Sequence, residues 1–406
     1  MARNYRLISA DSHLEISPDR WTRRIPAEHR DRAPRLVKLA SGGDGVLSEN
    51  TPLYVVGLGV AARPYDEHRI YGVTYDGNAG TGTPEQRLAE QDRDGVDAEV
   101  MFTSTRNAVA WRAIRDDAAY KAVVHAWNEF LAEEYCVADR DRLLAMGMIP
   151  MTGVDDAIAE LEYCARAGLR GVCLSQFPSG KGFPTREDDR FYAAVLDLEM
   201  PLTVHVGFVE APGPLFNHAK RPPDASAGPG SDPMFALARF GGGIAQTAIQ
   251  LVFGGVFDRF PELRVYFAET MAGWVGYCYE ELDDTYRRIQ RWAERDFGLE
   301  LRPRPPSADL RAHCRWGFLR DPFGVRHRDE AGVANMLWGS DFPHYVGDWP
   351  NSRKVLDEMF AGVPDDERYQ ITCGNAVEFF HLDPLRPTTP GGGASTLAGA
   401  ARPVAG

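Results

Sequence analysis

Short apolar runs alternate with amphipathic stretches along most of this chain, and this alternation constrains the fold more than any other feature. An apolar run followed by a helical stretch is typical of a parallel strand and its crossover helix. Eight runs are candidate strands: Arg6–Ala10, Ala98–Phe102, Leu144–Ile149, Gly171–Leu174, Leu202–His205, Arg264–Ala268, Cys314–Phe318 and Met336–Gly339. Eight such units predict a closed α/β barrel of the (β/α)₈ (TIM) type, with an open doubly wound sheet as the alternative.

Three segments interrupt this repeat, and one of them, residues 290–312, contains the run LRPRPPS. The other two are the candidates for a cap. Residues 16–84 follow the first candidate strand and residues 207–243 follow the fifth, and both contain clusters of Pro and Gly. Loops after barrel strands build the rim of the active site, so we expect both insertions to form a cap over it. We expect a single domain over residues 1–383 and a disordered, low-complexity tail over residues 384–406.

The charge and cysteine content exclude several classes of partner and location. The formal net charge is −13, which disfavours nucleic acid and anionic membrane as partners. The six cysteines include no C-x-x-C pair, and no apolar run is long enough for a signal core or a membrane span. The sequence therefore predicts a cytoplasmic protein with reduced thiols.

Acidic and imidazole side chains lie at the end of the first candidate strand. Asp11 and His13 are two residues apart, so in extended backbone they point to the same side and can reach one point at the barrel mouth. On its own this spacing is a weak signal. Glu15 adds a carboxylate in the same register and is either a reserve ligand or a group that supports the ligands.

His205 and Asp341 end or follow two further strands. His205 closes the run PLTVH, and Asp341 follows MLWGS, where Gly339 allows a close approach. A structural histidine and a helix N-cap are the plain alternatives. With Asp11 and His13, these residues place two carboxylates and two imidazoles at strands one, five and eight. That combination predicts one divalent ion, Zn²⁺ or Mn²⁺, held by Asp11, His13, His205 and Asp341.

Two more polar residues are candidates for acid–base chemistry. Glu269 follows the sixth strand and is either a general acid or base, a partner of the ligands, or an ordinary rim or cap residue. His344, three residues after Asp341, could contact a substrate or anchor its own loop.

Four residues are candidates for substrate contact. Arg63 and Arg106 lie on predicted loops and could bind a substrate carboxylate, although most arginines are solvated surface groups. Phe177 and Trp274 could line an aromatic pocket, with core packing as the alternative.

Seven segments in a fixed order resemble the amidohydrolase-related family that includes aminocarboxymuconate-semialdehyde decarboxylase. They are ADSHLEISPDRW, QDRDGVDAEVMF, DRLLAMGMIP, ARAGLRGVCL, GGVFDRFPELRVYFAETMAGW, LWGSDFPH and GNAVEFFHLD. The resemblance runs from residue 8 to about residue 383. It implies a distorted (β/α)₈ barrel with one divalent metal at its C-terminal mouth, with Asp11, His13, His205 and Asp341 at the ligand positions. It also suggests a homodimer.

Two positions depart from the decarboxylase that names the family. Asp11 replaces its first histidine, although other decarboxylases of the family also carry a carboxylate there, and Glu269 stands where it has a catalytic histidine. An anionic Glu269 would disfavour a second substrate carboxylate unless the metal or an arginine offsets it.

These departures leave three hypotheses about function. We first expect hydrolysis of a small aromatic or carboxylate-bearing molecule by a metal-activated water, with Asp341 as base and Glu269 or His344 assisting. The alternative is non-oxidative decarboxylation of an aromatic or unsaturated acid, in which Asp341 protonates the carbon that loses CO₂. A barrel that only binds a ligand is the third hypothesis.

Overall fold

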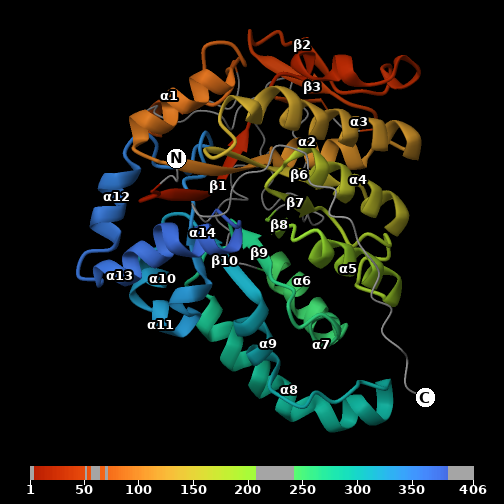
Figure 1. Ribbon diagram of the computed structural model, residues 1–406, viewed down its shortest axis with the longest axis vertical. Coiled ribbons are helices and arrows are strands. Elements are labelled where there is room, and N and C mark those ends of the chain that lie inside the picture. The colour runs from red at the N-terminus through yellow and green to blue at the C-terminus, as the bar shows by residue number, and fades with distance from the viewer. Residues whose placement is uncertain (1–3, 51–52, 56–64, 69–71, 207–241, 383–406) are drawn as a thin grey trace, which may run out of the picture.

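Eight parallel strands form the central sheet of the computed structural model, which describes residues 4–50, 53–55, 65–68, 72–206 and 242–382 (Figure 1). The spatial order of the strands follows the chain. They are β1 (Ile8–Leu14), β5 (Ala98–Thr103), β6 (Leu143–Ile149), β7 (Gly171–Leu174), β8 (Leu202–His205), β9 (Val265–Ala268), β10 (Cys314–Phe318) and β11 (Met336–Trp338). The predicted barrel is confirmed. The first strand lies further along the chain than predicted, so it contains Asp11 and His13 rather than preceding them.

The first and last strands meet just beyond β11, which brings the sheet close to a full barrel. Ser12 and Phe342 form an isolated parallel bridge. The Asp341 amide donates to the Asp11 carbonyl at 2.9 Å, and the His13 amide donates to the Phe342 carbonyl at 2.7 Å. The segment that carries Asp341 is therefore bonded directly to the segment that carries Asp11 and His13.

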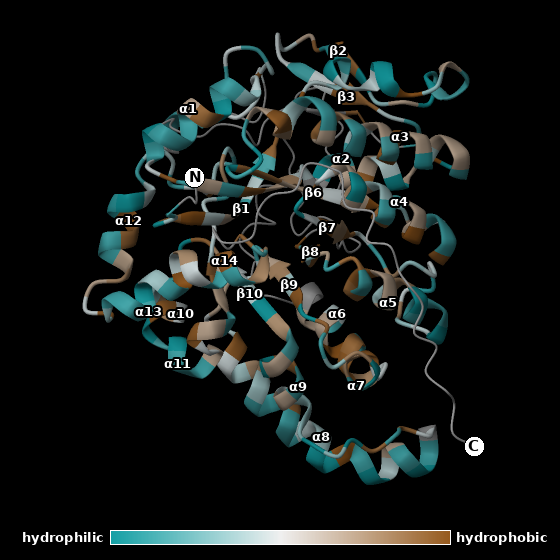
Figure 2. Cartoon of the chain, viewed as in Figure 1, coloured by the Kyte–Doolittle hydropathy of each residue, from teal (hydrophilic) through white to brown (hydrophobic). Residues whose placement is uncertain are grey.

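Helices follow the strands and cover the outside of the sheet (Figure 1). They are α1 (Pro84–Asp94), α2 (Thr105–Arg112), α3 (Asp117–Phe130), α4 (Val154–Ala167), α5 (Asp189–Asp197), α6 (Gly242–Phe253), α7 (Val256–Arg259), α8 (Val275–Phe297), α9 (Pro306–His313), α10 (Pro322–Arg326), α11 (Arg328–Ala331), α12 (Ser352–Met359), α13 (Asp365–Tyr369) and α14 (Asn375–Phe379). Hydrophobic residues gather on the strands and inner helix faces in Figure 2, while the outer faces are largely hydrophilic.

The helix α4 illustrates why these segments fold as they do. Ala157, Leu161 and Cys164 recur at helical spacing and are all buried. The helix stops at Gly168, which adopts the left-handed conformation (φ 81°) that glycine tolerates best. Burial of an apolar stripe and a glycine stop therefore set the length of this crossover.

A buried arginine fastens α1 to both ends of the barrel seam. The three guanidinium nitrogens of Arg87 donate to the Glu99 carboxylate (2.5 Å), the His13 carbonyl (2.9 Å) and the Phe342 carbonyl (3.3 Å). Gln91 also donates to Glu99, at 2.9 Å. We refer to Arg87, Glu99 and these partners as the Arg87 clamp.

The described part of the first insertion lies against the loop that follows β11. It contains an antiparallel sheet of β2 (Arg35–Lys38), β3 (Asp44–Leu47) and β4 (Tyr54–Val55). Val73 and Tyr75 of this insertion pack in one cluster with Tyr345. A Cβ atom on Gly80 would lie 2.4 Å from the Pro343 ring, so this ring packs directly against the Gly80 backbone.

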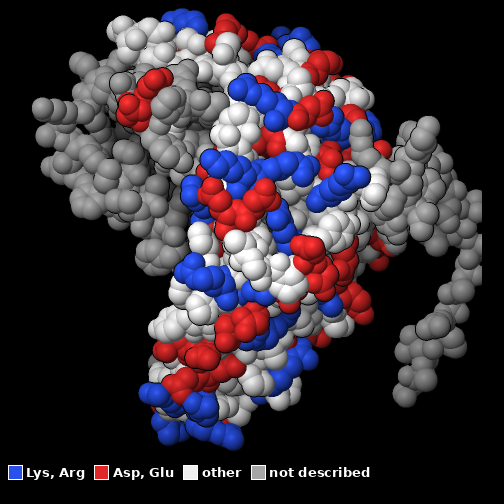
Figure 3. All heavy atoms as spheres, turned by 90° about the vertical axis from the view of Figure 1, so that its left-hand side faces the viewer, with Lys and Arg blue, Asp and Glu red and all other residues white. Residues whose placement is uncertain are grey.

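The second predicted insertion and the tail fall largely outside the described residues. Residues 207–241 and 383–406 are not described, and α6 already begins at Gly242, inside the predicted insertion. Within the described residues, no helix combines the length and the hydropathy that a membrane crossing requires. On the face seen in Figure 3, the acidic and basic side chains of the described residues are intermingled.

Candidate metal centre

Four side chains converge at the C-terminal ends of β1, β8 and β9. One ligand atom from each of Asp11, His13, His205 and Glu269 lies within 4.8 Å of the others, and all four residues are buried. The Asp11 Oδ1 atom is 3.2 Å from His205 Nε2 and 3.7 Å from His13 Nε2. Glu269 Oε2 is 3.8 Å from His205 Nε2. We call these four residues the donor cluster.

Asp341 joins this cluster through His13 and begins a second hydrogen-bonded group. Its Oδ1 atom is 3.1 Å from His13 Nε2 and 2.9 Å from His344 Nδ1. The other ring nitrogen of His344 is 3.1 Å from Glu15 Oε1. We call Glu15, His344 and Asp341 the acid–base triad. Sequence reasoning missed the contact between Glu15 and His344, although the i, i+2 register of His13 and Glu15 offered a signal for it.

Backbone carbonyls orient the two imidazoles of the donor cluster. His205 Nδ1 is 2.7 Å from the Val206 carbonyl, and His13 Nδ1 is 3.3 Å from the Thr103 carbonyl. A carbonyl partner on Nδ1 fixes the tautomer whose Nε2 atom has a free lone pair. Metal-binding histidines are usually held in this way.

Two buried carboxylate oxygens fit a bound cation. Asp11 Oδ2 and Asp341 Oδ2 have no hydrogen-bond partner among the described residues. A buried polar atom without a partner costs free energy, so its presence indicates a ligand that completes the site. Carboxylate oxygens and imidazole nitrogens are donors that both Zn²⁺ and Mn²⁺ accept. The residues present therefore fit the divalent metal that the sequence predicts.

The protonation states of the three central groups follow from burial and from each other. Burial lowers the pKa of His13 to about 4. Burial alone would lower the pKa of His344 as well, but the carboxylates of Asp341 and Glu15 raise it to about 9. Burial opposes ionisation of Asp341, yet the charge of His344 holds its pKa below the ordinary range. Near neutral pH the triad therefore carries a proton on His344.

Two of the candidate residues have unusual backbone conformations. Glu269 (φ 59°) and Asp341 (φ 52°) both lie in the left-handed region, where residues other than glycine are uncommon. Such conformations cost about 1–3 kcal/mol each and cluster at functional sites. The surrounding hydrogen bonds, such as that from the Thr270 amide to the Gly317 carbonyl at 2.8 Å, keep Glu269 in place.

The four predicted substrate-contact residues lie in different surroundings. Arg63 lies outside the described residues. Arg106 is in the first turn of α2 rather than on a loop, and its charge helps to lower the pKa of Glu15, in addition to the hydrogen bond and charge of His344. Phe177 is buried in the core, and the Trp274 indole donates to the Thr270 carbonyl at 2.7 Å. Substrate contact stays a prediction for all four.

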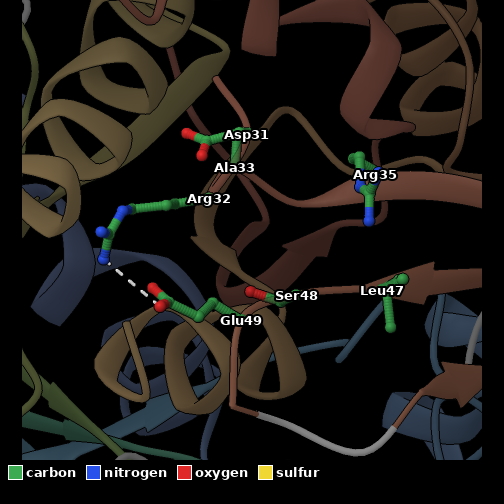
Figure 4. Close-up of a pocket in the computed structure, with 7 residues that line it drawn as sticks. All are labelled: Asp31, Arg32, Ala33, Arg35, Leu47, Ser48 and Glu49. Atoms are coloured by element: carbon green, nitrogen blue, oxygen red, sulfur yellow. Dashed lines mark hydrogen bonds and ion pairs between the residues drawn. The ribbon is translucent and has the colours of Figure 1, made fainter. Parts of the chain in front are cut away.

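A separate surface hollow lies in the first insertion, away from the candidate ligands. It is lined by Asp31, Arg32, Ala33, Arg35, Leu47, Ser48 and Glu49. Figure 4 shows Arg32 paired with Glu49 across it, at 3.3 Å. None of the donor cluster or the acid–base triad lines this hollow, so we place the chemistry at the barrel mouth instead.

A buried His and carboxylate centre at the mouth of a (β/α)₈ barrel defines a class of metal-dependent enzymes. A family model described as Amidohydrolase matches residues 11–382, so the chain belongs to the amidohydrolase family. It is therefore an enzyme of that family.

Three relatives illustrate the similarity. The 2-amino-3-carboxymuconate-6-semialdehyde decarboxylase of Dictyostelium discoideum is 22% identical over 306 residues, covering 74% of this chain and 77% of the relative. An amidohydrolase structure from Mycobacterium avium subsp. paratuberculosis K-10 superposes with a TM-score of 0.68 at 18% identity, covering 93% and 98% of the two chains. A dihydroxybenzoic acid decarboxylase from Polaromonas sp. JS666, with bound manganese and the inhibitor 2-nitroresorcinol, has a TM-score of 0.56 at 17% identity, covering 93% and 98%.

These comparisons alter the order of our functional hypotheses. Further matches among curated proteins and solved structures are decarboxylases as well. The relatives therefore favour decarboxylation, our alternative hypothesis, over the hydrolysis that we expected first.

Proposed function

We propose that this chain is a metal-dependent, non-oxidative decarboxylase of a small aromatic acid. The observation that carries the proposal is the pairing of a buried donor cluster with a hydrogen-bonded proton source in one site. Asp11, His13 and His205 supply metal-ligand atoms. The Oδ1 atom of Asp341 lies within hydrogen-bond distance of His344 Nδ1, at 2.9 Å. The decarboxylase names of the relatives support the same reaction class.

The residues that would hold the metal are Asp11, His13, His205 and the unpartnered oxygen of Asp341. A divalent cation bound there, Mn²⁺ or Zn²⁺, supplies Lewis acidity that orients an acid substrate and stabilises negative charge as CO₂ departs. The manganese in the Polaromonas decarboxylase supports Mn²⁺ as the first ion to test.

The chain's own contribution to the reaction is a proton delivered at Asp341. Decarboxylation breaks the bond between the ring carbon and its carboxylate, and the electron pair of that bond remains on the ring carbon. A proton from the Asp341–His344 pair forms the new C–H bond, and CO₂ leaves. Glu15 contacts the far nitrogen of His344 at 3.1 Å, so it holds that imidazole protonated and oriented toward Asp341.

Burial of the site favours this reaction over attack by water. Asp11, His13, His205 and Asp341 have no solvent exposure in the described structure. In such surroundings the charge interactions of the reacting carboxylate are stronger than in water. Arg106 in α2 is a candidate to offset the negative charge, since its charge adds to the hydrogen bond and charge of His344 in lowering the pKa of Glu15.

The test is CO₂ release by the Mn²⁺-loaded protein from a panel of hydroxylated benzoic acids, including 2,6-dihydroxybenzoate and 5-carboxyvanillate. Two relatives with the same fold are decarboxylases named for these acids. We expect CO₂ release from at least one aromatic acid, and a fall of at least about 1,000-fold in Asp341→Asn, which removes the carboxylate that relays the proton of His344 and completes the metal site. Glu160→Gln, on the distant helix α4, is the matched control and should keep its activity.

Hydrolysis is the outcome that would contradict the proposal. If the metal-loaded protein releases no CO₂ from any acid in the panel but cleaves carboxylic esters or amides, and Asp341→Asn abolishes that cleavage, the centre is hydrolytic.

A further inference from the structure

We propose that Glu269 is a direct ligand of the metal, which adds a third carboxylate to the centre and favours Mn²⁺ over Zn²⁺. This inference rests on the metal centre of the proposed function, but it does not depend on which reaction that centre performs.

The first argument is the grouping of the donor atoms. The compact four-residue group is Asp11, His13, His205 and Glu269, whereas Asp341 groups with His13 and His344. Ligand atoms about 2.0–2.2 Å from one ion lie at most about 4.4 Å apart. The 4.8 Å span of the group that contains Glu269 therefore needs only a small contraction around an ion.

The second argument is that the fold fixes Glu269 at this point. The left-handed φ of 59° turns the chain sharply where β9 ends. On either side, the Val206 amide donates to the Ala268 carbonyl at 3.2 Å and the Thr270 amide donates to the Gly317 carbonyl at 2.8 Å. The side chain is 2% exposed, so its carboxylate is held inside the protein rather than in solvent. Burial of a carboxylate costs free energy, and a bound cation offsets that cost.

The third argument is that other residues already supply the acid–base chemistry. Asp341 Oδ1 is engaged by His344, which in turn contacts Glu15. Glu269 Oε2 instead lies 3.8 Å from Nε2 of His205, itself a candidate ligand. The position of Glu269 therefore matches a ligand better than a proton carrier.

The choice of ion follows from the donor set. With Glu269, the centre offers carboxylates from Asp11, Glu269 and Asp341 together with two imidazoles. Zn²⁺ prefers four donors in tetrahedral geometry, whereas oxygen-rich sites with more ligands suit Mn²⁺. Loss of Glu269 should therefore weaken Mn²⁺ binding more than Zn²⁺ binding.

The experiment is calorimetric titration of the metal-free protein with Mn²⁺ and, separately, with Zn²⁺, without substrate. We expect Glu269→Ala to weaken Mn²⁺ binding by at least about 100-fold, beyond the usual effect of losing a residue that only supports a ligand. The fold-loss in Zn²⁺ affinity should be at least about ten times smaller than the fold-loss in Mn²⁺ affinity. Glu269→Gln, which keeps the shape, should fall between the wild type and Glu269→Ala. Glu160→Gln, with circular dichroism on every variant, controls for the loss of a buried carboxylate elsewhere.

A crystal of the Mn²⁺-bound wild type provides an independent readout. We expect a Glu269 oxygen within about 2.0–2.6 Å of the ion. The inference is overturned if Glu269→Ala binds Mn²⁺ within twofold of the wild type, or if the Glu269 carboxylate lies more than about 3 Å from the ion. If the wild type itself binds neither ion, the proposed function fails together with this inference. If the wild type binds Mn²⁺ and Glu269→Ala binds it equally well, the inference about Glu269 fails but the proposed function does not.

Discussion

The Arg87 clamp and the donor cluster both bury charge within a few residues of His13, but they treat that charge in opposite ways. In the clamp, each guanidinium nitrogen of Arg87 has an acceptor, and Glu99 receives hydrogen bonds from Arg87 and Gln91. At the metal centre, Asp11 Oδ2 and Asp341 Oδ2 have no partner among the described residues. The clamp holds the barrel seam closed, whereas the centre keeps oxygen atoms for a ligand.

The contrast shows that the Arg87 clamp stabilises the folded protein by itself, whereas the metal centre stabilises it only when a ligand is bound. Removing one partner of a buried, fully hydrogen-bonded ion pair strongly destabilises the folded protein. Unsatisfied groups at active sites lower the stability of the empty protein, and a bound ligand restores it. Substitutions in the two regions should therefore differ in sign as well as in size.

The largest effect is expected from breaking the clamp. Arg87→Met leaves the Glu99 carboxylate buried without a cation, so we expect a loss of about 3–5 kcal/mol in the free energy of unfolding. Urea denaturation followed by circular dichroism measures it. Arg166→Met, which removes an exposed surface arginine, should change stability by less than about 0.5 kcal/mol. A loss below about 1 kcal/mol in Arg87→Met would show that the clamp is not needed to close the seam.

Metal addition should separate the two regions most clearly. At a free Mn²⁺ concentration 100 times its dissociation constant, we expect the wild type to gain about 2.7 kcal/mol. Asp11→Asn should gain little at the same concentration, because it loses a charged ligand. In the absence of metal, the same variant should be as stable as the wild type or more stable by about 1 kcal/mol. Thermal melts with and without Mn²⁺ report both values, and marked destabilisation of metal-free Asp11→Asn would contradict the comparison.

A smaller effect is expected where backbone packing brings the two ends of the seam together. A Cβ atom on Gly339 would lie 2.5 Å from the Asp11 Cβ. Gly339→Ala should therefore cost about 1–3 kcal/mol and displace Asp11. Gly362→Ala is the matched control, because a Cβ atom there meets nothing within 4 Å, although its φ of 82° adds local strain. We expect Mn²⁺ affinity to fall only in Gly339→Ala, as measured by calorimetry; unchanged affinity would mean that Asp11 tolerates the shift.

The sequence predicts the barrel well because its signals are local. The eight apolar runs correspond to the eight strands, and Gly168 ends α4 where a glycine stop is expected. The end of β1 was missed, because SHL continues the strand as a result of pairing with β5, which local pattern does not reveal. Strand pairing is a non-local interaction that a single segment does not encode.

The location of the site can be predicted from the sequence, but the contacts between its side chains are harder to predict. Strand-end position alone brings Asp11, His13 and His205 together. The grouping of Glu269 with them depends on a left-handed turn, and the contact between His344 and Glu15 depends on the closure of the barrel between β11 and β1. Both are consequences of tertiary geometry. Most of the predicted cap segment at 207–243, and Arg63, lie outside the described residues, so their predicted roles stay predictions.

The most direct test of decarboxylation at this centre is an isotope measurement on the acid that the Mn²⁺-loaded protein consumes. The reaction is run in parallel in D₂O and in H₂¹⁸O, and the aromatic product is analysed by mass spectrometry and NMR. We predict one deuterium at the carbon that carried the carboxylate, one CO₂ per product, and no ¹⁸O in the aromatic product. Incorporation of ¹⁸O into the product without release of CO₂ would contradict the account.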